Sequence, residues 1–385
     1  DTTKGDYAYE SAPNSTDLTW ETVITKNIGL DLGFLNNRLN VSFDAYIRDT
    51  KDMLMAGKTL PGVYGASSPR MNVADLRTKG WEASVTWGDS FTLASKPFNY
   101  RIMAGIGDNT SKVTKYDNPN RTLTDPYEGQ QLGEIWGYVV DGYFKTDEEA
   151  RNYKVDQSFV NQMINASALD NGLHAGDLKF VDLDGNNKIE QTTSANDRKD
   201  MKVIGNSLPR YNYNFGISAD WYGIDFSVLF QGIGKQNWYP GAETSMFWGP
   251  YSRPYASFIP SDFMSQVWSE ENTNAYFPRP RGYVALGSNR ELAVVNTKYL
   301  QNLAYCRLKN LSIGYTLPDK WLSKIGFEKI RVYFSGENLL TFTKLHSDYI
   351  DPEQASASNS WKTSKSDANI YPWAKTYSFG VDITF

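Results

Sequence analysis

The last ten residues read Thr376-Tyr-Ser-Phe-Gly-Val-Asp-Ile-Thr-Phe385, with a large apolar side chain at every second position. A period of two is typical of a β-strand that has one apolar and one polar face. Such a strand can close the edge of a soluble β-sandwich. It can equally be the last strand of an outer-membrane barrel, which turns its apolar face to lipid and its polar face to the lumen.

The composition excludes several classes of protein. The chain has 385 residues with 39 Lys and Arg against 44 Asp and Glu, and its net charge of −5 is too small to favour nucleic acid or an anionic membrane surface. No apolar run approaches the roughly 18 residues that a membrane-spanning helix needs. A polar average is compatible with a barrel, because half of each barrel strand faces water. Only one cysteine, Cys306, is present, so no intrachain disulfide can form.

The same alternation recurs along the chain and predicts about nine antiparallel strands. Asn36-Asn37 and Tyr222-Gly223 each separate two alternating segments, which predicts tight hairpin turns. The apolar positions change phase between Leu308 and Leu311, which predicts a β-bulge. A short helix is expected near Thr146–Asn165, because its first turn is acidic.

The connections between these strands alternate between short and long. The longest lie near 110–208 and 235–298. Short turns at one rim and long loops at the other are the plan of bacterial outer-membrane barrels, in which the short turns are periplasmic and the long loops extracellular. Trp20, Trp87 and Trp221 lie near strand ends, as interfacial aromatics do. Because about nine strands cannot close such a barrel, and because Asp1 reads like the inside of a loop, we expect the remaining strands upstream.

Motifs in nearly every part of the chain resemble the SusC/RagA class of TonB-dependent outer-membrane transporters, and they keep the order found in that family. These motifs are Asp17-Leu-Thr-Trp-Glu21, Asn27-Ile-Gly-Leu-Asp31, Asn37-Arg-Leu-Asn40, Asn72-Val-Ala-Asp-Leu-Arg-Thr-Lys-Gly-Trp-Glu82, Val203-Ile-Gly-Asn-Ser-Leu-Pro-Arg-Tyr211, Cys306-Arg-Leu-Lys-Asn-Leu-Ser-Ile-Gly-Tyr-Thr-Leu-Pro318 and Ser335-Gly-Glu-Asn-Leu-Leu-Thr341.

The resemblance implies an all-β fold in which residues 1–385 form the C-terminal part of a transmembrane barrel of about 22 strands with a plugged lumen. The plug and the N-terminal strands are then expected upstream. The implied function is TonB-energised import of a bulky nutrient, an oligosaccharide or a peptide, across the outer membrane of a Gram-negative bacterium of the Bacteroidota. The last strand resembles the signal read by the barrel-assembly machinery, carried by Tyr377, Phe379, Val381, Ile383 and Phe385.

The resemblance also implies partners. A SusD-like surface lipoprotein would cover the long loops as a lid, and the TonB complex would act through an upstream segment. The upstream half of the barrel, its plug and outer-membrane lipid would surround this chain, and no nucleic acid is expected. A dimer of SusC–SusD pairs stays open.

One acidic segment fits part of a calcium-loop pattern. Asp182, Asp184 and Asn186 stand at positions one, three and five, where oxygen ligands can wrap a cation. The pattern departs from the consensus at position six, which is Asn187, and at position twelve, which carries no carboxylate. The alternatives are a structural Ca²⁺ or Mg²⁺ and a solvated polar turn. The predicted ligands in the 182–197 loop are Asp182, Asp184, Asn186, the Lys188 carbonyl, Glu190 and Asp197.

A second segment is rich in aromatic residues. Exposed aromatic side chains can stack on sugars or hold a partner protein, whereas buried ones would pack the loop against itself. The residues predicted to contact substrate or a lid are Trp238, Tyr239, Phe247, Trp248, Tyr251 and Tyr255. Polar residues of the strands, such as Asp44 and Glu82, are expected to face the lumen.

Catalysis finds little support in the sequence, so we expect no enzyme. No Walker loop, dinucleotide fingerprint, HExxH motif or zinc spacing is present. The main alternative to an importer is a secreted β-rich glycan-binding protein or glycosidase, since two catalytic carboxylates need no local motif. The location of the alternating apolar side chains separates the two: a barrel exposes them in a continuous band, and a sandwich buries them in a core.

Overall fold

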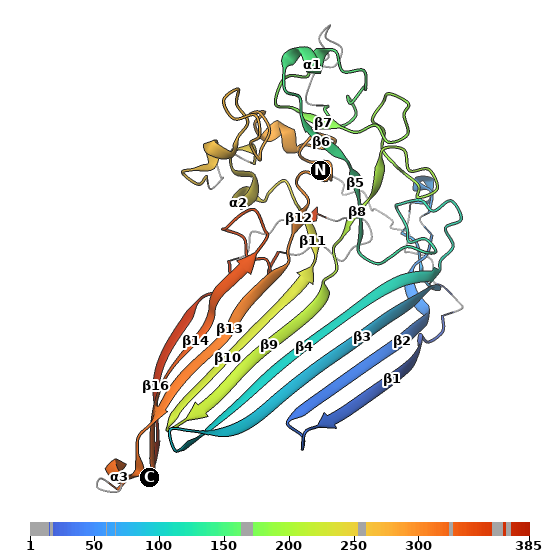
Figure 1. Cartoon of the computed structure of the whole chain (residues 1–385). Helices are drawn as coiled ribbons and strands as arrows, with labels where there is room; N and C mark the ends of the chain where they lie inside the picture. Colours follow the sequence, from blue (N-terminus) through green and yellow to red (C-terminus); the bar gives the residue numbers. More distant parts are fainter. Residues whose placement is uncertain are drawn as a thin grey trace, which may run out of the picture.

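A single antiparallel sheet dominates the computed structural model (Figure 1), which describes residues 15, 18–58, 60–65, 67–162, 172–252, 259–322, 326–355, 365–366 and 371–385. Nine strands pair in the order β1-β2-β3-β4-β9-β10-β13-β14-β16. Their bounds are β1 Thr22–Phe34, β2 Leu39–Ala56, β3 Arg70–Leu93, β4 Lys96–Lys115, β9 Arg210–Trp221, β10 Ile224–Lys235, β13 Tyr305–Thr316, β14 Lys329–Thr343 and β16 Thr376–Thr384. The all-β prediction with about nine antiparallel strands is therefore confirmed.

Short connections lie at one end of this sheet. The turn between β9 and β10 consists of Tyr222 and Gly223, with φ of 51° and 82°. Two consecutive left-handed residues are what a type I′ hairpin needs. Asn36 and Asn37 between β1 and β2 are also left-handed, as predicted for a tight turn. The connection from β13 to β14 contains α3, Asp319–Leu322.

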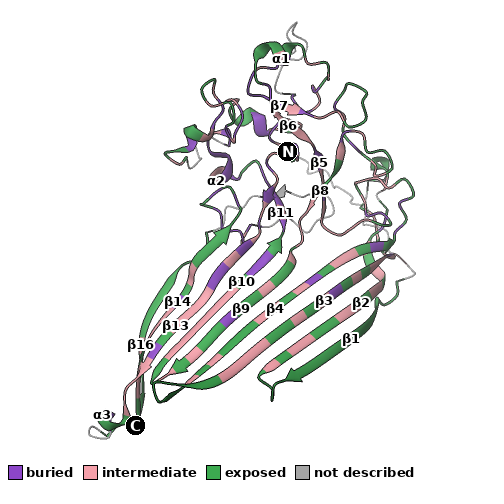
Figure 2. Cartoon of the chain, in the orientation of Figure 1, coloured by how far each residue is buried: buried purple, intermediate pink, exposed green. Residues whose placement is uncertain are grey.

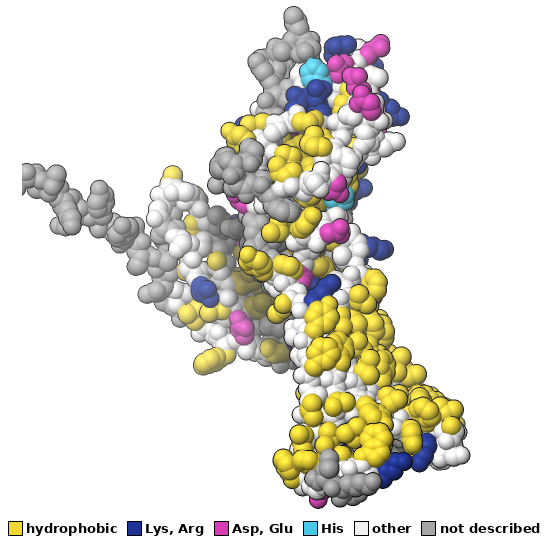
Figure 3. Space-filling view, turned by 90° about the vertical axis from the view of Figure 1, so that its left-hand side faces the viewer, with side chains coloured by type: hydrophobic (Ala, Val, Ile, Leu, Met, Phe, Trp, Pro, Cys, Tyr) yellow, Lys and Arg dark blue, Asp and Glu magenta, His cyan; other side chains and the backbone are white. Residues whose placement is uncertain are grey.

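Apolar side chains line one face of the sheet, which we call the apolar face. Ile102, Ile217 and Val228 lie side by side in register on β4, β9 and β10. Ile217 is 43% exposed and Phe379 on β16 is 83% exposed. Figure 2 shows exposed and intermediate residues along all nine strands, and Figure 3 shows hydrophobic side chains gathered over the strand region. These side chains do not meet in a core, which contradicts the sandwich and agrees with a lipid-facing band.

The opposite, polar face carries charged and amide side chains. Arg331 on β14 donates bonds of 2.8 and 2.6 Å to Asp225 on β10, and one of 3.2 Å to Asp382 on β16. Its side chain passes over Gly314 of β13, where a Cβ atom would lie 2.5 Å from the guanidinium. Because Gly314 has no side chain, Arg331 can reach across β13 to β10 while it also bonds to β16.

The long connections build a loop cap at the other end of the sheet (Figure 1). We use this name for the described residues of 116–209, 236–304 and 344–375. It contains β5 Glu134–Tyr138, β6 Val140–Tyr143, α1 Asp147–Arg151, β7 Leu178–Phe180, β8 Met201–Asn206, β11 Asn237–Pro240, α2 Ser245–Trp248, β12 Gln301–Asn302 and β15 Lys365–Ser366, with 3-10 turns at Gly249–Tyr251, Phe263–Gln266 and Tyr283–Leu286. A further 3-10 turn, Gly62–Tyr64, follows β2.

Two local predictions can be compared with the structure. The bulge is confirmed, because the register of β13 against β14 shifts between Leu308 and Asn310. The helix expected over 146–165 is too long, since α1 ends at Arg151. Asp156 instead donates its N–H to Asn187 and accepts from Ile189, and these bonds to the acidic loop replace the helical ones. No helix among the described residues is long and apolar enough to cross a membrane.

Candidate functional site

The acidic loop follows β7 and folds around the carboxylate of Asp182. That carboxylate accepts backbone N–H bonds of 2.7 Å from both Gly185 and Asn187. Burial opposes the effect, but these donors lower the pKa of Asp182 below its ordinary value. Asn187 adopts a left-handed φ of 62°, so the chain makes at this position the sharp turn for which calcium loops use glycine.

Asp200 completes the cluster, although the sequence pattern did not single it out. It is fully buried and accepts N–H bonds from Leu183 at 2.8 Å and Glu190 at 2.7 Å. Burial raises the pKa of Asp200. One carboxylate oxygen each from Asp182, Asp184 and Asp200 lies within 4.8 Å of the others. Three converging carboxylates repel one another, and a hard cation with oxygen ligands would relieve that repulsion.

The structure brings Asp200, rather than Asp197, together with Asp182 and Asp184, while ion binding itself stays a prediction. Asp197 is exposed, lies outside this cluster, and belongs to a turn in which its N–H bonds to the Ser194 carbonyl. Asn186 uses its amide to donate to Asp184 at 3.2 Å and to Glu190 at 3.1 Å, and its oxygen accepts from the Lys188 N–H. Asn186 and Glu190 therefore serve the internal bonding of the loop.

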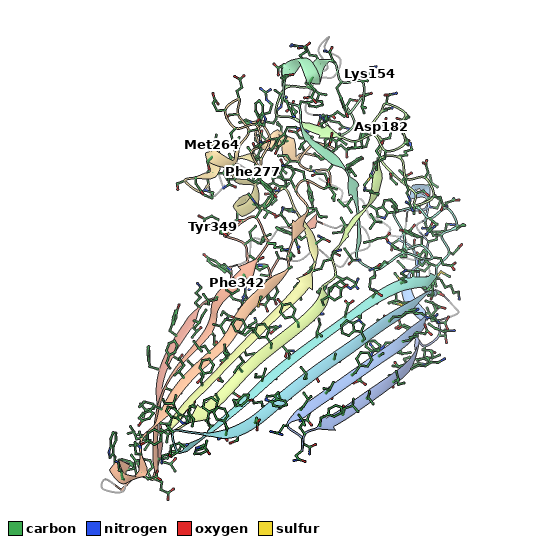
Figure 4. All side chains as sticks on the ribbon, in the orientation of Figure 1. Lys154, Asp182, Met264, Phe277, Phe342 and Tyr349 are labelled. Carbon is green, nitrogen blue, oxygen red and sulfur yellow. The ribbon has the colours of Figure 1, made fainter. Side chains whose placement is uncertain are left out.

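The aromatic residues predicted to contact substrate or a lid form the interior of the loop cap. Trp238, Tyr239 and Trp248 are 0% exposed, and Phe247 and Tyr251 are 2% exposed. Tyr255 lies outside the described residues. Three of these rings pack around Phe277, which is labelled in Figure 4: the ring centres of Phe247, Tyr251 and Trp248 lie 5.7, 5.8 and 6.3 Å from that of Phe277. This arrangement favours loop packing over direct contact with a substrate.

The polar ends of these rings have backbone partners inside the cap. The hydroxyl of Tyr239 donates to the Leu292 carbonyl at 2.8 Å, and the indole of Trp248 donates to the Gly241 carbonyl at 3.0 Å. Buried tyrosine and tryptophan need such acceptors. The aromatic content of this connection thus gives a long loop a core of its own.

The residues predicted as the assembly signal all belong to the apolar face or its end. Tyr377, Phe379, Val381 and Ile383 alternate along β16, and Phe385 follows it. All five are exposed. Phe379 contacts Phe334 of β14 at 5.2 Å between ring centres. All five side chains are therefore accessible on the strand. Their recognition by the barrel-assembly machinery stays a prediction.

The polar face is hollowed between β2, β3, β4 and β9. A cavity of about 360 Å³ there is lined by Asp44, Glu82, Asn212 and Asn214 among other residues. Asp44 and Glu82 lie directly opposite each other across β2 and β3. This face can therefore hold water, polar groups and cations, as the inner wall of a barrel does.

Comparisons with known proteins agree with this geometry. Residues 2–339 match the family model described as TonB dependent receptor-like, beta-barrel. TonB-dependent receptor P3 of Formosa agariphila is 28% identical over 387 residues, which cover 96% of this chain and 34% of the relative. TonB-dependent receptor SusC of Bacteroides thetaiotaomicron is 24% identical over 370 residues, with 96% and 32% covered. A solved structure of the RagAB peptide transporter superposes with a TM-score of 0.67 at 23% identity, covering 96% of this chain and 36% of that chain. The chain thus spans about a third of the length of these relatives.

Proposed function

The chain belongs to the TonB-dependent receptor-like β-barrel family, and we propose that it forms part of the wall and the outer loops of a TonB-energised importer. Proteins of this family lie in the outer membrane, so the nine strands cross that membrane. The short turns then lie on the periplasmic side and the loop cap on the extracellular side. As a domain assignment, residues 1–385 make up the C-terminal part of a barrel of about 22 strands.

One observation carries this proposal: the sheet has an exposed apolar face and a hollowed polar face. Lipid covers the first, and the aqueous lumen lies against the second. The loop cap adds a rigid entrance, because its buried aromatic core fixes long loops that would otherwise move. A chain with these three features can hold a polar passage through lipid, and it needs no catalytic residues for that task.

The proposed cargo is a bulky nutrient, an oligosaccharide or a peptide. Support comes from the relatives, which are named as TonB-dependent receptors, SusC among them, and from the likeness of fold to a peptide transporter. A SusD-like lipoprotein over the loop cap, a plug inside the lumen and the TonB complex complete the proposed assembly. Pairing of two such complexes into a dimer would be a further level of this assembly.

We further propose that Asp182, Asp184 and Asp200 hold a structural Ca²⁺ or Mg²⁺ in the loop cap. The cation would fix the 182–200 segment against α1 and its neighbours, since Asp156 already bonds to Asn187 and Ile189. Its proposed role is structural, because the three carboxylates lie within one loop and the cation would join segments of that loop.

The experiment is uptake by cells that carry the intact protein. Labelled oligosaccharide and peptide pools are offered to cells with and without an active TonB complex, and outer membranes are extracted with detergent in parallel. The proposal expects a detergent-dependent protein, a co-purifying lipoprotein, and uptake that stops when TonB is inactivated. Recovery of the protein without detergent, or uptake independent of both the protein and TonB, would overturn the proposal.

A further inference from the structure

A basic pocket lies in the first long connection, between the β5–β8 pair and two neighbouring turns. Its volume is about 350 Å³. Three cations line it, namely Arg121, Arg198 and Lys202, and the only carboxylate in its lining is Glu134. The lining therefore has an excess of two positive charges in a protein whose net charge is −5. A local reversal of sign of this kind attracts anions.

The three cations are available to a ligand. No carboxylate among the described residues forms an ion pair with Arg121, Arg198 or Lys202. Arg121 lies over the ring of Tyr127, 4.8 Å from its centre, and it donates to the Glu128 carbonyl at 3.3 Å. Its Nε atom is buried without any partner in the described structure. Buried donors of this kind normally have an acceptor, so Arg121 has hydrogen-bonding capacity left for a ligand.

Glu134 offsets only one of the three positive charges of the pocket, and its carboxylate is held against one wall. It accepts from the Tyr127 hydroxyl, and the indole N–H of Trp136 donates to the same oxygen at 2.9 Å. These two aromatic residues also line the pocket. The pocket thus combines an aromatic wall, one carboxylate anchored to that wall, and three cations.

The pocket adjoins the end of the barrel wall. A second cavity of about 340 Å³ shares Glu134 and Val203 with it and reaches Arg210 and Lys235. These two residues pair across β9 and β10 where the strands enter the loop cap. Arg210 is bound to Asp108, so the charges nearer the strands are partly compensated. A ligand in the basic pocket would therefore lie beside the entrance of the polar face.

We propose that the basic pocket binds an acid group, a carboxylate or a sulfate, of the substrate that the importer takes up. This inference rests on the proposed function and narrows its substrate to an anionic class. Guanidinium groups bind carboxylate and sulfate through paired N–H donors, and the lysine adds a point charge. An acidic sugar and an acidic peptide offer the same chemistry, and the experiment has a separate arm for each.

The test measures binding to the intact transporter in detergent by calorimetry. The probes are a galacturonate oligosaccharide, its neutral methyl ester and a hexapeptide rich in aspartate. Arg198→Gln is expected to weaken binding of the acidic probe about tenfold, which corresponds to about 1.4 kcal/mol. Arg151→Gln, an exposed charge removal at the end of α1, is the matched control and should leave affinity unchanged.

A third variant changes affinity in the opposite direction. Glu134→Gln keeps an acceptor for Tyr127 and Trp136 but removes the one negative charge, so binding of the acidic probe should tighten. Salt should weaken that binding in the wild type, because ions screen charges at the surface. Preference for the sugar or for the peptide identifies the source of the acid group.

Equal affinity of the wild type for the acidic and neutral probes, or equal effects of Arg198→Gln and Arg151→Gln, would overturn the inference. The proposed function fails separately. If the acidic probe binds with the expected pattern but its uptake does not depend on TonB, anion binding by the pocket is supported and the proposed import function is refuted.

Discussion

Ile217 lies on the apolar face of β9, which lipid covers in the proposed barrel, so Ile217→Arg places a charge inside the membrane. Ile217 is 43% exposed on the apolar face and lies four residues from Trp221, whose indole donates to the Leu93 carbonyl at the short-turn end. A strand rises about 3.3 Å per residue, and barrel strands tilt by about 40°. Ile217 therefore lies about 10 Å above Trp221. Since the apolar band of a barrel is about 25 Å tall, this position is close to its middle.

An arginine at the bilayer midplane costs about 2–4 kcal/mol. Ile217→Arg should therefore lower the ratio of folded to unfolded protein roughly 30- to 700-fold. The control is Ser218→Arg, the next residue on the same strand, which projects from the polar face. It adds the same side chain to the aqueous side and should cost well under 2 kcal/mol, about 1 kcal/mol at most, because Arg101 lies opposite it on β4.

The assay is folding of the intact protein into lipid vesicles across a urea series, with the folded fraction read from its resistance to unfolding in detergent gels. Lipid contact at Ile217 is refuted if Ser218→Arg destabilises the protein as much as Ile217→Arg or more. It is equally refuted if Ile217→Arg folds with the same urea midpoint as the wild type.

Three further predictions test other parts of the molecule. Arg331→Lys should destabilise the barrel by about 1 kcal/mol, because lysine cannot reproduce the paired bonds to Asp225; Arg101→Lys on the same face is the control in urea titrations. Asp200→Asn should weaken Ca²⁺ binding at least roughly tenfold, seen as lost calcium protection of 182–200 against proteolysis, whereas Asp197→Asn should retain that protection. Burial raises the pKa of Glu291 to about 8 from an ordinary value of 4.5, with the nearby charge of Asp177 adding to the effect. Glu291 then binds its proton more tightly in the folded cap, so its contribution to stability is complete below pH 4.5 and is lost as the pH rises through about 8. The protection of the Leu178 N–H, which bonds to Glu291, against hydrogen exchange relative to a free amide should fall over that range in the wild type and stay constant in Glu291→Gln.

The strands could be predicted from the sequence because their signals are local. Alternation in Tyr213, Phe215 and Ile217 shows which side chains share a face, and the change of phase after Leu308 marks the bulge. Lipid rather than protein covers the apolar face, so the alternation along the strands is not blurred by packing against further elements.

The loop cap was less predictable because long-range contacts determine it. Asp200 joins Asp182 only because the chain returns to the acidic loop, and spacing alone pointed to Asp197. The sequence around Trp248 does not show whether its aromatic residues are exposed or buried. The folded loop cap shows that they form a core. The helix after Thr146 stops early because Asp156 pairs with the acidic loop, a partner that no local pattern reveals.

The most direct test of the account is an accessibility scan along β9 in the intact protein, reconstituted in lipid vesicles. Nitroxide labels are introduced one at a time through cysteine at positions 212–219, with Cys306→Ser as the background. We predict that positions 213, 215, 217 and 219 are accessible to dissolved oxygen in the bilayer, and that the positions between them are accessible to a water-soluble nickel complex. Equal accessibility of neighbouring positions, or accessibility of all of them to the nickel complex alone, would contradict a strand with lipid on one side and an aqueous lumen on the other.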